Sequence, residues 1–201
     1  ASAHKFHGPK GVGILYAKRN GPLSVAGDAA VIITGGGQQR GIRSGTENVP
    51  DVVGAAVAIL IAADPTHLQR THQRLAAARK SLLSKLGPTT IHNGGAVKTV
   101  PHIINLILSP RLHGHEITSM ADEMGLSINS GSACSKQQKP SATLANMGLS
   151  IGLSHSAIRI SLSDCTTDRQ IGRMGDVLVS VRDRLMKLHD EHHSEGNYYY
   201  Q

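Results

Sequence analysis

Residues 2–13 read Ser-Ala-His-Lys-Phe-His-Gly-Pro-Lys-Gly-Val-Gly, with Lys5 among hydrogen-bonding side chains and a glycine-rich turn directly after them. A lysine that forms a Schiff base must be neutral and held against an aldehyde, and nearby Ser and His side chains can bind a phosphate while the lysine stays free. A basic surface loop has a similar composition, and the spacing taken alone favours that simpler interpretation. Other segments of the chain are needed to distinguish a Schiff-base lysine from a basic surface loop.

A second glycine-rich segment occupies residues 35–48 and reads Gly-Gly-Gly-Gln-Gln-Arg-Gly-Ile-Arg-Ser-Gly-Thr-Glu-Asn. Glycine at this density indicates backbone that turns tightly or approaches a ligand closely. A hydroxyl at the start of a helix, here Thr46 with Arg40 and Arg43 nearby, favours the binding of a dianion. A purely structural glycine turn is the alternative.

Hydrophobic periodicity and glycine or proline breaks predict the secondary structure of the first half. Short buried strands are expected at residues 12–16 and 29–34. Alanine-rich helix follows from Asn48, is interrupted at Pro65 and ends at Gly87-Pro88, because proline cannot continue a helix.

The second half alternates between strand and helix patterns. An apolar run at residues 103–108 precedes a short helix that Gly125 ends, and residues 157–162 alternate as a strand. The last helix is predicted from apolar residues spaced three and four apart between Ile171 and Leu188, and Thr167 with Gln170 forms a capping box. These elements predict an α/β fold.

The segment Ser-Gly-Ser-Ala-Cys-Ser at residues 130–135 carries one of the two cysteines. A lone cysteine is more often a small buried hydrophobic residue. Cys134, however, lies between small and polar residues, and Lys136 and Lys139 favour the thiolate, which is the reactive form. The other cysteine, Cys165, has no such surroundings and is given no role.

The segment His-Ser-Ala-Ile-Arg-Ile-Ser-Leu at residues 155–162 alternates between apolar and polar side chains. The pattern places Ile158 and Ile160 on one face of a strand and Arg159 with Ser161 on the other. A guanidinium fixed in the middle of a strand is suited to hold a carboxylate through two hydrogen bonds. An ordinary half-exposed strand arginine is the alternative.

Composition excludes several classes of function. The 21 basic and 14 acidic residues give a net charge of +7 and a pI near 9.7, which raises the question of a nucleic-acid or acidic partner. One Phe, four Tyr and no Trp provide too few aromatic platforms for a single-strand binder, so no nucleic-acid partner is expected. The longest apolar stretch, residues 52–63, is too short for a bilayer, and no membrane association is expected.

Two cysteines and no signal peptide indicate a reducing interior with free thiols. We expect the protein in the cytoplasm, or in an organelle matrix in a eukaryote. His192-His193 near the end could suggest metal binding, but an unstructured end is the favoured interpretation and no metal site is expected.

Four segments together resemble motifs of the NifS/IscS-type cysteine desulfurases, within the class V aminotransferase family of fold-type I pyridoxal-phosphate enzymes. The family motifs are Ser-Gly-His-Lys-x-x-Gly-Pro-Lys-Gly-x-Gly, Gly-Gly-Gly-x-Glu-Arg-Gly-x-Arg-Ser-Gly-Thr-Glu-Asn, Ser-Gly-Ser-Ala-Cys and His-Ser-Ser-Ile-Arg-Phe-Ser-Leu. This chain departs at Ala3 (usually glycine), at Gln39 (usually glutamate, so an ion pair in that loop is expected to be missing) and at residues 136–141.

The resemblance implies a role for each matching residue. Lys5 is expected to form the Schiff base with pyridoxal 5'-phosphate, with Ser2 and His4 on the cofactor phosphate. Thr46 is expected to reach the cofactor phosphate of the other subunit of a homodimer. Cys134 is expected to accept the sulfur and Arg159 to anchor the carboxylate of the substrate.

The implied activity is pyridoxal-phosphate-dependent removal of sulfur from L-cysteine, which gives L-alanine and a persulfide on Cys134. The sulfur is expected to pass to an acceptor or scaffold protein for iron–sulfur clusters or thiolated products. A selenocysteine lyase, a class V aminotransferase, or a non-catalytic half that binds a scaffold protein are the alternatives.

The resemblance also implies a division of the chain. Residues 1–50 are expected to form the C-terminal end of the transferase large domain, 51–86 connecting helices, 87–190 a small C-terminal α/β domain and 191–201 a flexible tail. The chain starts at Ala1 with a motif already under way, so a fragment or one piece of a split enzyme is expected. A separate N-terminal half would hold the aspartate for the pyridine nitrogen, and we expect this chain alone to be inactive or nearly so.

Overall fold

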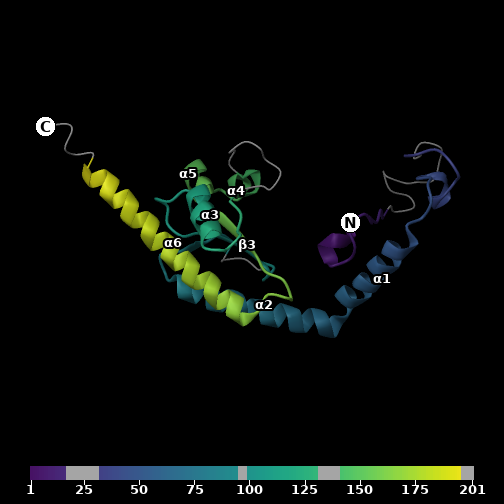
Figure 1. The fold of residues 1–201 in the computed structure, drawn as a ribbon, viewed down its shortest axis with the longest axis horizontal. Coiled ribbons are helices and arrows are strands. Elements are labelled where there is room, and N and C mark those ends of the chain that lie inside the picture. The colour runs from purple at the N-terminus through teal and green to yellow at the C-terminus, as the bar shows by residue number, and fades with distance from the viewer. Residues whose placement is uncertain (17–31, 95–98, 131–140, 196–201) are drawn as a thin grey trace. The chain divides into compact units, whose positions relative to one another are not determined.

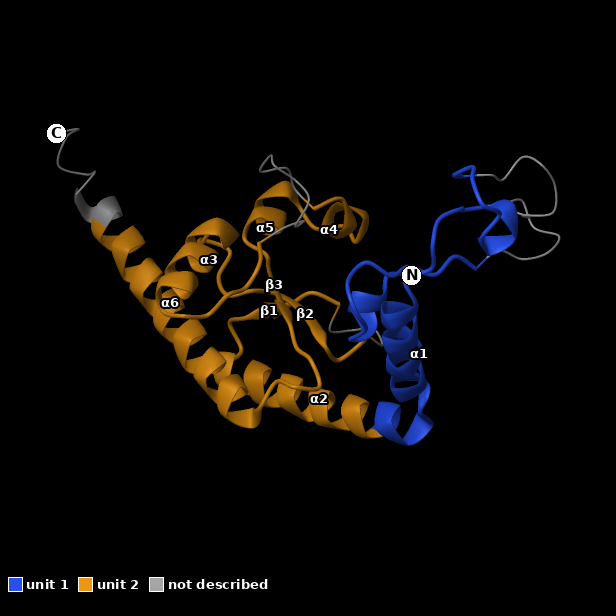
Figure 2. Ribbon diagram, turned by 45° about the vertical axis from the view of Figure 1, so that its right-hand side comes forward, with its two compact units in different colours: residues 1–69 blue, residues 70–201 orange. Residues whose placement is uncertain are grey.

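The computed structural model describes residues 1–16, 32–94, 99–130 and 141–195, without the side chains of 192–195 (Figure 1). These residues form two compact units, 1–69 and 70–201 (Figure 2). The predicted mixture of helices and sheet is confirmed.

In the first unit, residues 1–14 fold back on themselves. The Ala1 ammonium donates to the Ile14 carbonyl at 2.6 Å, and the Ile14 N–H donates to the Ala1 carbonyl at 2.8 Å. The 3-10 helix η1 (Ala3–Phe6) lies inside this closed loop. A second short 3-10 helix, η3 (Gln39–Gly41), lies in the other glycine-rich segment.

The strand predicted at residues 12–16 is wrong. Only Gly13 pairs, in an isolated bridge with Ser2, and the exposed fractions of Ile14, Leu15 and Tyr16 are 42%, 69% and 84%. Their apolar character therefore does not reflect burial within the described part of the chain.

The strand predicted at 29–34 lies partly outside the described residues. Within them, Ile33 makes one isolated parallel bridge, with Arg43, and both Ile32 and Ile33 are exposed.

Helix α1 (Val49–Ala63) begins at Asn48, whose side-chain oxygen accepts a hydrogen bond from the backbone N–H of Asp51. It ends before Pro65, as predicted, because that proline opens α2 (Pro65–Leu86). Within α1 only two alanines are buried. The exposed large side chains of this helix are Val49, Val52, Val53, Val57, Ile59, Leu60 and Ile61.

The second unit is built around a three-stranded antiparallel sheet of order β1-β2-β3. Its strands are β1 (Ile91–His92), β2 (Ile103–Ile107) and β3 (Ile158–Ser161). Ile104 pairs with Ile160, and Asn105 pairs with Arg159. Since side chains alternate along a strand, this register places the isoleucines on one face of the sheet and the polar pair on the other.

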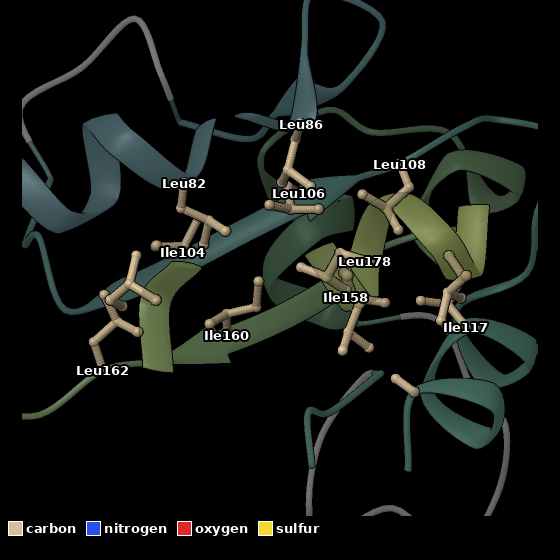
Figure 3. Close-up of a cluster of buried hydrophobic side chains, with 14 of the residues drawn as sticks. Leu82, Leu86, Ile104, Leu106, Leu108, Ile117, Ile158, Ile160, Leu162 and Leu178 are labelled. Atoms are coloured by element: carbon tan, nitrogen blue, oxygen red, sulfur yellow. The ribbon is translucent and has the colours of Figure 1, made fainter. Parts of the chain in front are cut away.

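The main hydrophobic core lies on the isoleucine face, under α2, α3 (Gly114–Glu123) and α6 (Asp168–Glu195). Figure 3 shows side chains from these helices meeting those of β2 and β3. The fully buried members include Leu82, Ile104, Ile117, Ile158 and Leu178.

The short helices α4 (Ala142–Asn146) and α5 (Ile151–His155) belong to a smaller cluster. Leu144 packs there with Ile107 and Ala157, beside Leu149 and Leu153.

Helix α6 begins with the predicted capping box. The Thr167 hydroxyl accepts from the Gln170 N–H at 3.3 Å, and the Gln170 side chain accepts from the Thr167 N–H at 2.8 Å. The helix extends to Glu195, so the first five residues of the tail expected at 191–201 are helical. An Arg111–Asp190 ion pair of 2.6 Å and a His189–Glu116 contact of 3.5 Å hold its last turns.

Among the described residues, no single helix is both long and apolar enough to cross a bilayer; α1 and α2 meet that test only as a bent pair.

We predict that Leu178→Ala lowers the free energy of unfolding by about 3 kcal/mol, because it leaves a cavity in a fully buried position. Leu188→Ala, on the same helix but 44% exposed, is the matched control and should cost less than about 1 kcal/mol. Urea unfolding followed by circular dichroism measures both. Equal losses would show that the described core is not the core in solution.

Candidate active site

Lys5 lies in a tightly closed turn. The Lys5 N–H donates to the Ser2 carbonyl at 3.0 Å, and the Gly8 N–H donates to the Ala3 carbonyl at 2.9 Å. A Cβ atom on Gly8 would lie 3.0 Å from the Ala3 Cβ, so the close approach requires glycine. The turn buries Ala3 and leaves the side chains of His4 and Lys5 exposed.

This turn brings together three of the predicted cofactor residues. Ser2 offers a hydroxyl, His4 an imidazole and Lys5 an amine, and no acidic side chain in the described part of the chain pairs with Lys5. A phosphate needs hydrogen-bond donors and an aldehyde needs a free amine, so this set of groups fits pyridoxal phosphate.

The second glycine-rich loop is held by buried Ser44. Its hydroxyl accepts from the Gly37 N–H at 3.2 Å, and the Ser44 N–H donates to the Ile33 carbonyl at 3.0 Å. Arg40 has a left-handed backbone, with φ of 59°, which is strained for a residue other than glycine. Such strain persists only where the surrounding loop fixes the conformation.

Thr46 is exposed and lies three residues before the first residue of α1. No hydrogen bond among the described residues joins it to the Lys5 turn. Gln39, where the sequence leads us to expect a missing ion pair, forms no ion pair with a described residue. Its side-chain amide donates a hydrogen bond to the Glu47 carboxylate at 2.7 Å.

Arg159 lies in the second unit, on the face of β3 opposite the core, as the alternation predicts. Its backbone pairs with Asn105 of β2 on one side and, through an isolated bridge, with Asn129 on the other. The Asn93 N–H donates to the Asn105 carbonyl at 3.0 Å. A row of four polar residues therefore crosses this face of the sheet.

Arg159 lines a cavity of about 540 Å³ in this unit. Its apolar wall is made by side chains from β2, α4 and the segments beside them. Its polar lining residues are Arg79, His92, Asn93, Thr99, Asn105, Ser141, Thr143 and Arg159. The apolar members are Val100, Ile103, Leu144, Met147 and Ala157. By surface area the wall is mainly apolar, with several convergent polar groups, which is typical of a small-molecule site.

The two arginines of this cavity differ. The Arg79 guanidinium donates to Thr99 Oγ1 at 2.8 Å and to the Val100 carbonyl at 3.2 Å, and lies 2.8 Å from His92 Nε2. The Arg159 guanidinium has no hydrogen bond or ion pair with any described residue. Arg159 is therefore the cavity cation available to an anion.

Burial and, after it, the Arg79 charge lower the pKa of His92. The neutral ring can accept the Arg79 hydrogen bond through Nε2, so His92 orients Arg79 rather than competing with it. Sequence reasoning missed both residues, because each is an ordinary polar residue on a helix or strand surface. Asn93 and Asn105 were missed as well, although Asn105 interrupts an apolar run.

Cys134 lies outside the described residues. Ser130, the last described residue before it, lies close to α3, because a Cβ on Gly114 of that helix would lie 3.0 Å from the Ser130 Cβ and 2.7 Å from the Ala157 carbonyl oxygen. Cys165 is exposed and free, in the loop after β3. The described residues hold no cluster of three or more His, Cys, Asp or Glu suited to a metal ion.

His92 should make the protein less stable in mild acid. Its folded pKa lies below the ordinary 6.5, so the unfolded chain binds the proton first as the pH falls. The stability due to neutral His92 is complete above 6.5 and is lost as the pH drops through the folded pKa. We predict that His92→Gln reduces the loss of unfolding free energy between about pH 8 and about pH 5. Urea unfolding across that range tests this, and an unchanged pH dependence would contradict it.

The comparisons with known proteins all find related proteins. The model for the aminotransferase class-V family matches residues 1–174. A cysteine desulfurase of Cereibacter sphaeroides is 35% identical over 190 residues, which are 93% of this chain and 46% of the relative. The solved structure of a NifS-like protein has a TM-score of 0.75 at 30% identity, over 90% of this chain and 44% of the other.

A structure described as SspA in complex with cysteine has a TM-score of 0.51 at 28% identity, over 80% of this chain and 42% of the other. The chain thus spans a little less than half the length of the relatives it matches. Since the family model matches most of its residues, the chain belongs to the class-V aminotransferase family.

Proposed function

We propose that this chain is the C-terminal portion of a cysteine desulfurase that uses pyridoxal phosphate. The observation that carries the proposal is Arg159, a guanidinium with no described counter-ion in a mostly apolar cavity. An α-amino acid with a small side chain suits such a cavity, because its carboxylate pairs with the guanidinium. The relatives named cysteine desulfurase supply the choice among amino acids.

Ser2, His4, Lys5 and Thr46 would hold the cofactor. Pyridoxal phosphate, when bound, supplies an electron sink for bond breaking next to the amino carbon. The Lys5 side chain is exposed on a turn closed by hydrogen bonds, so its amine can reach an aldehyde and afterwards take the proton from Cα of the substrate. Ser2 and His4 are its neighbours in the turn and would donate hydrogen bonds to the phosphate.

Arg159 would fix the substrate by its carboxylate, so that the Cα proton and the sulfur face the reacting groups. The structure of SspA was solved with cysteine, and its similarity to this chain supports L-cysteine as the substrate.

Cys134 would then receive the sulfur. Its thiolate attacks the sulfur of the substrate, the carbon–sulfur bond breaks, and the carbon takes up a proton. The products are L-alanine and a persulfide on Cys134, and the atoms of L-cysteine are all accounted for. The persulfide sulfur would pass to an acceptor protein for iron–sulfur clusters or thiolated products.

The rest of the catalytic site would come from residues outside these 201. The seven large apolar side chains exposed on α1 support this, since so much exposed apolar surface on one helix favours a covering partner. We propose that the remaining half of the enzyme covers this surface, in a homodimer located in the cytoplasm, or in an organelle matrix in a eukaryote. The chain by itself should then form little or no sulfide from L-cysteine.

The cofactor role of Lys5 predicts where pyridoxal phosphate attaches. Borohydride reduction of the chain with pyridoxal phosphate should leave the cofactor mass on Lys5, read by peptide mass spectrometry. Lys10→Ala, an exposed lysine of the same loop, is the matched control and should leave this labelling intact. Labelling spread evenly over the exposed lysines would mean that Lys5 has no special role.

The sulfur role of Cys134 predicts a sharp difference between the two cysteines. In the assembled enzyme, Cys134→Ala should lower alanine formation from L-cysteine by at least about 10³-fold, because the sulfur loses its acceptor. Cys165→Ala, which removes the exposed cysteine after β3, should leave the rate unchanged. Loss of activity in the Cys165 variant alone would overturn the assignment.

A further inference from the structure

Asn105 is the residue of β2 that pairs with Arg159 of β3. The two residues pair across β2 and β3, and both side chains line the same cavity. Residues directly opposite on one face of an antiparallel pair have Cβ atoms about 5 Å apart. Their side chains can therefore act on one small ligand.

The Asn105 amide has its oxygen already engaged. The Asn93 side-chain amide donates to the Asn105 Oδ1 at 2.5 Å. Asn93 follows β1, on one side of β2, and Arg159 is on β3, on the other side. With its oxygen held on the β1 side, Asn105 is left with an NH₂ group for the β3 side, where Arg159 lies.

Asn105 and Arg159 form no side-chain hydrogen bond with each other in the structure. An amide NH₂ and a guanidinium are both donors, and neither donates a hydrogen bond to a described residue, although the hydroxyls of Thr99, Ser141 and Thr143 line the same cavity. Arg79, the other cation, already has three partners. Two adjacent groups with only donors to offer, set against an apolar wall, are complementary to an anion with several acceptor lone pairs.

We propose that Asn105 is a second carboxylate-binding residue beside Arg159, and that Asn93 positions it. The guanidinium takes the carboxylate by two hydrogen bonds, and the Asn105 NH₂ group donates a third. Asn93 is a positioning residue, because its hydrogen bond fixes which end of the Asn105 amide faces the ligand. The inference rests on the proposed function for the identity of the ligand, an α-amino acid.

The arrangement also predicts selectivity. A carboxamide would turn an NH₂ group toward these donors, where a carboxylate presents only acceptors. The cavity should therefore prefer L-alanine, the expected product, to L-alaninamide, which has the same side chain and amine.

Nuclear magnetic resonance of the full chain, labelled with ¹⁵N, tests this directly. The Asn105 side-chain amide resonance, identified by its loss in Asn105→Asp, should shift saturably with L-alanine. Binding of L-alaninamide should be weaker by about tenfold or more, since one hydrogen bond to a charged group is replaced by a donor–donor contact.

Three variants separate recognition from structure. Asn105→Asp keeps an acceptor for Asn93 but replaces the donor by a charge, and should weaken L-alanine binding by at least about tenfold, read at the Arg159 side chain. Asn93→Ala should weaken it by about threefold to tenfold. Asn146→Ala, an exposed asparagine of α4 outside the cavity lining, is the matched control and should bind as the parent does.

A shift at Arg159 without one at Asn105 would overturn the role of Asn105, as would equal responses to L-alanine and L-alaninamide. No response at either residue would also overturn it. A lower unfolding temperature with an unchanged preference for L-alanine would show that Asn105 is merely structural. The proposed function is tested separately, by the labelling of Lys5, so the failure of the one can be told from the failure of the other.

Discussion

The alternation of side chains along β3 ties the hydrophobic core to the candidate site. Ile158 and Ile160 are buried in the core, so Arg159 between them must face the opposite side of the sheet. A slip of one residue in the pairing with β2 would bury a guanidinium and expose two isoleucines. The same packing that stabilises the second unit therefore holds Arg159 and Asn105 in register.

Much of the fold follows from the sequence where periodicity is long or a breaker is strong. The capping box at Thr167, the break at Pro65, the glycine end at Gly125 and the alternation around Arg159 all appear as predicted. The strand at residues 12–16 fails because three apolar residues in a row indicate burial only if a partner surface is present. Strand β1 was missed because two residues show no period, and only pairing with β2 defines them.

The residues of the candidate site also fall into those that the sequence indicates and those that only the folded structure brings together. The alternation around Arg159 indicates its face of the strand, whereas the roles of Arg159 and Lys5 come from motif resemblance and stay predictions. The roles of Arg79, His92, Asn93 and Asn105 depend on which segments meet in space, and no local pattern carries that information. The hydrogen bond from Asn93 to Asn105, twelve residues away, exists only because β1 and β2 pair.

Helix α1 has a consequence for how the isolated chain behaves in solution. This fifteen-residue helix buries two alanines and exposes seven valine, isoleucine and leucine side chains to water. Such an exposed apolar patch favours association between molecules. Self-association should then rise with concentration even though the second unit is well packed. The net charge of +7 opposes this through mutual repulsion, and added salt screens that repulsion. Low ionic strength is therefore the condition in which a homogeneous preparation is easiest to keep.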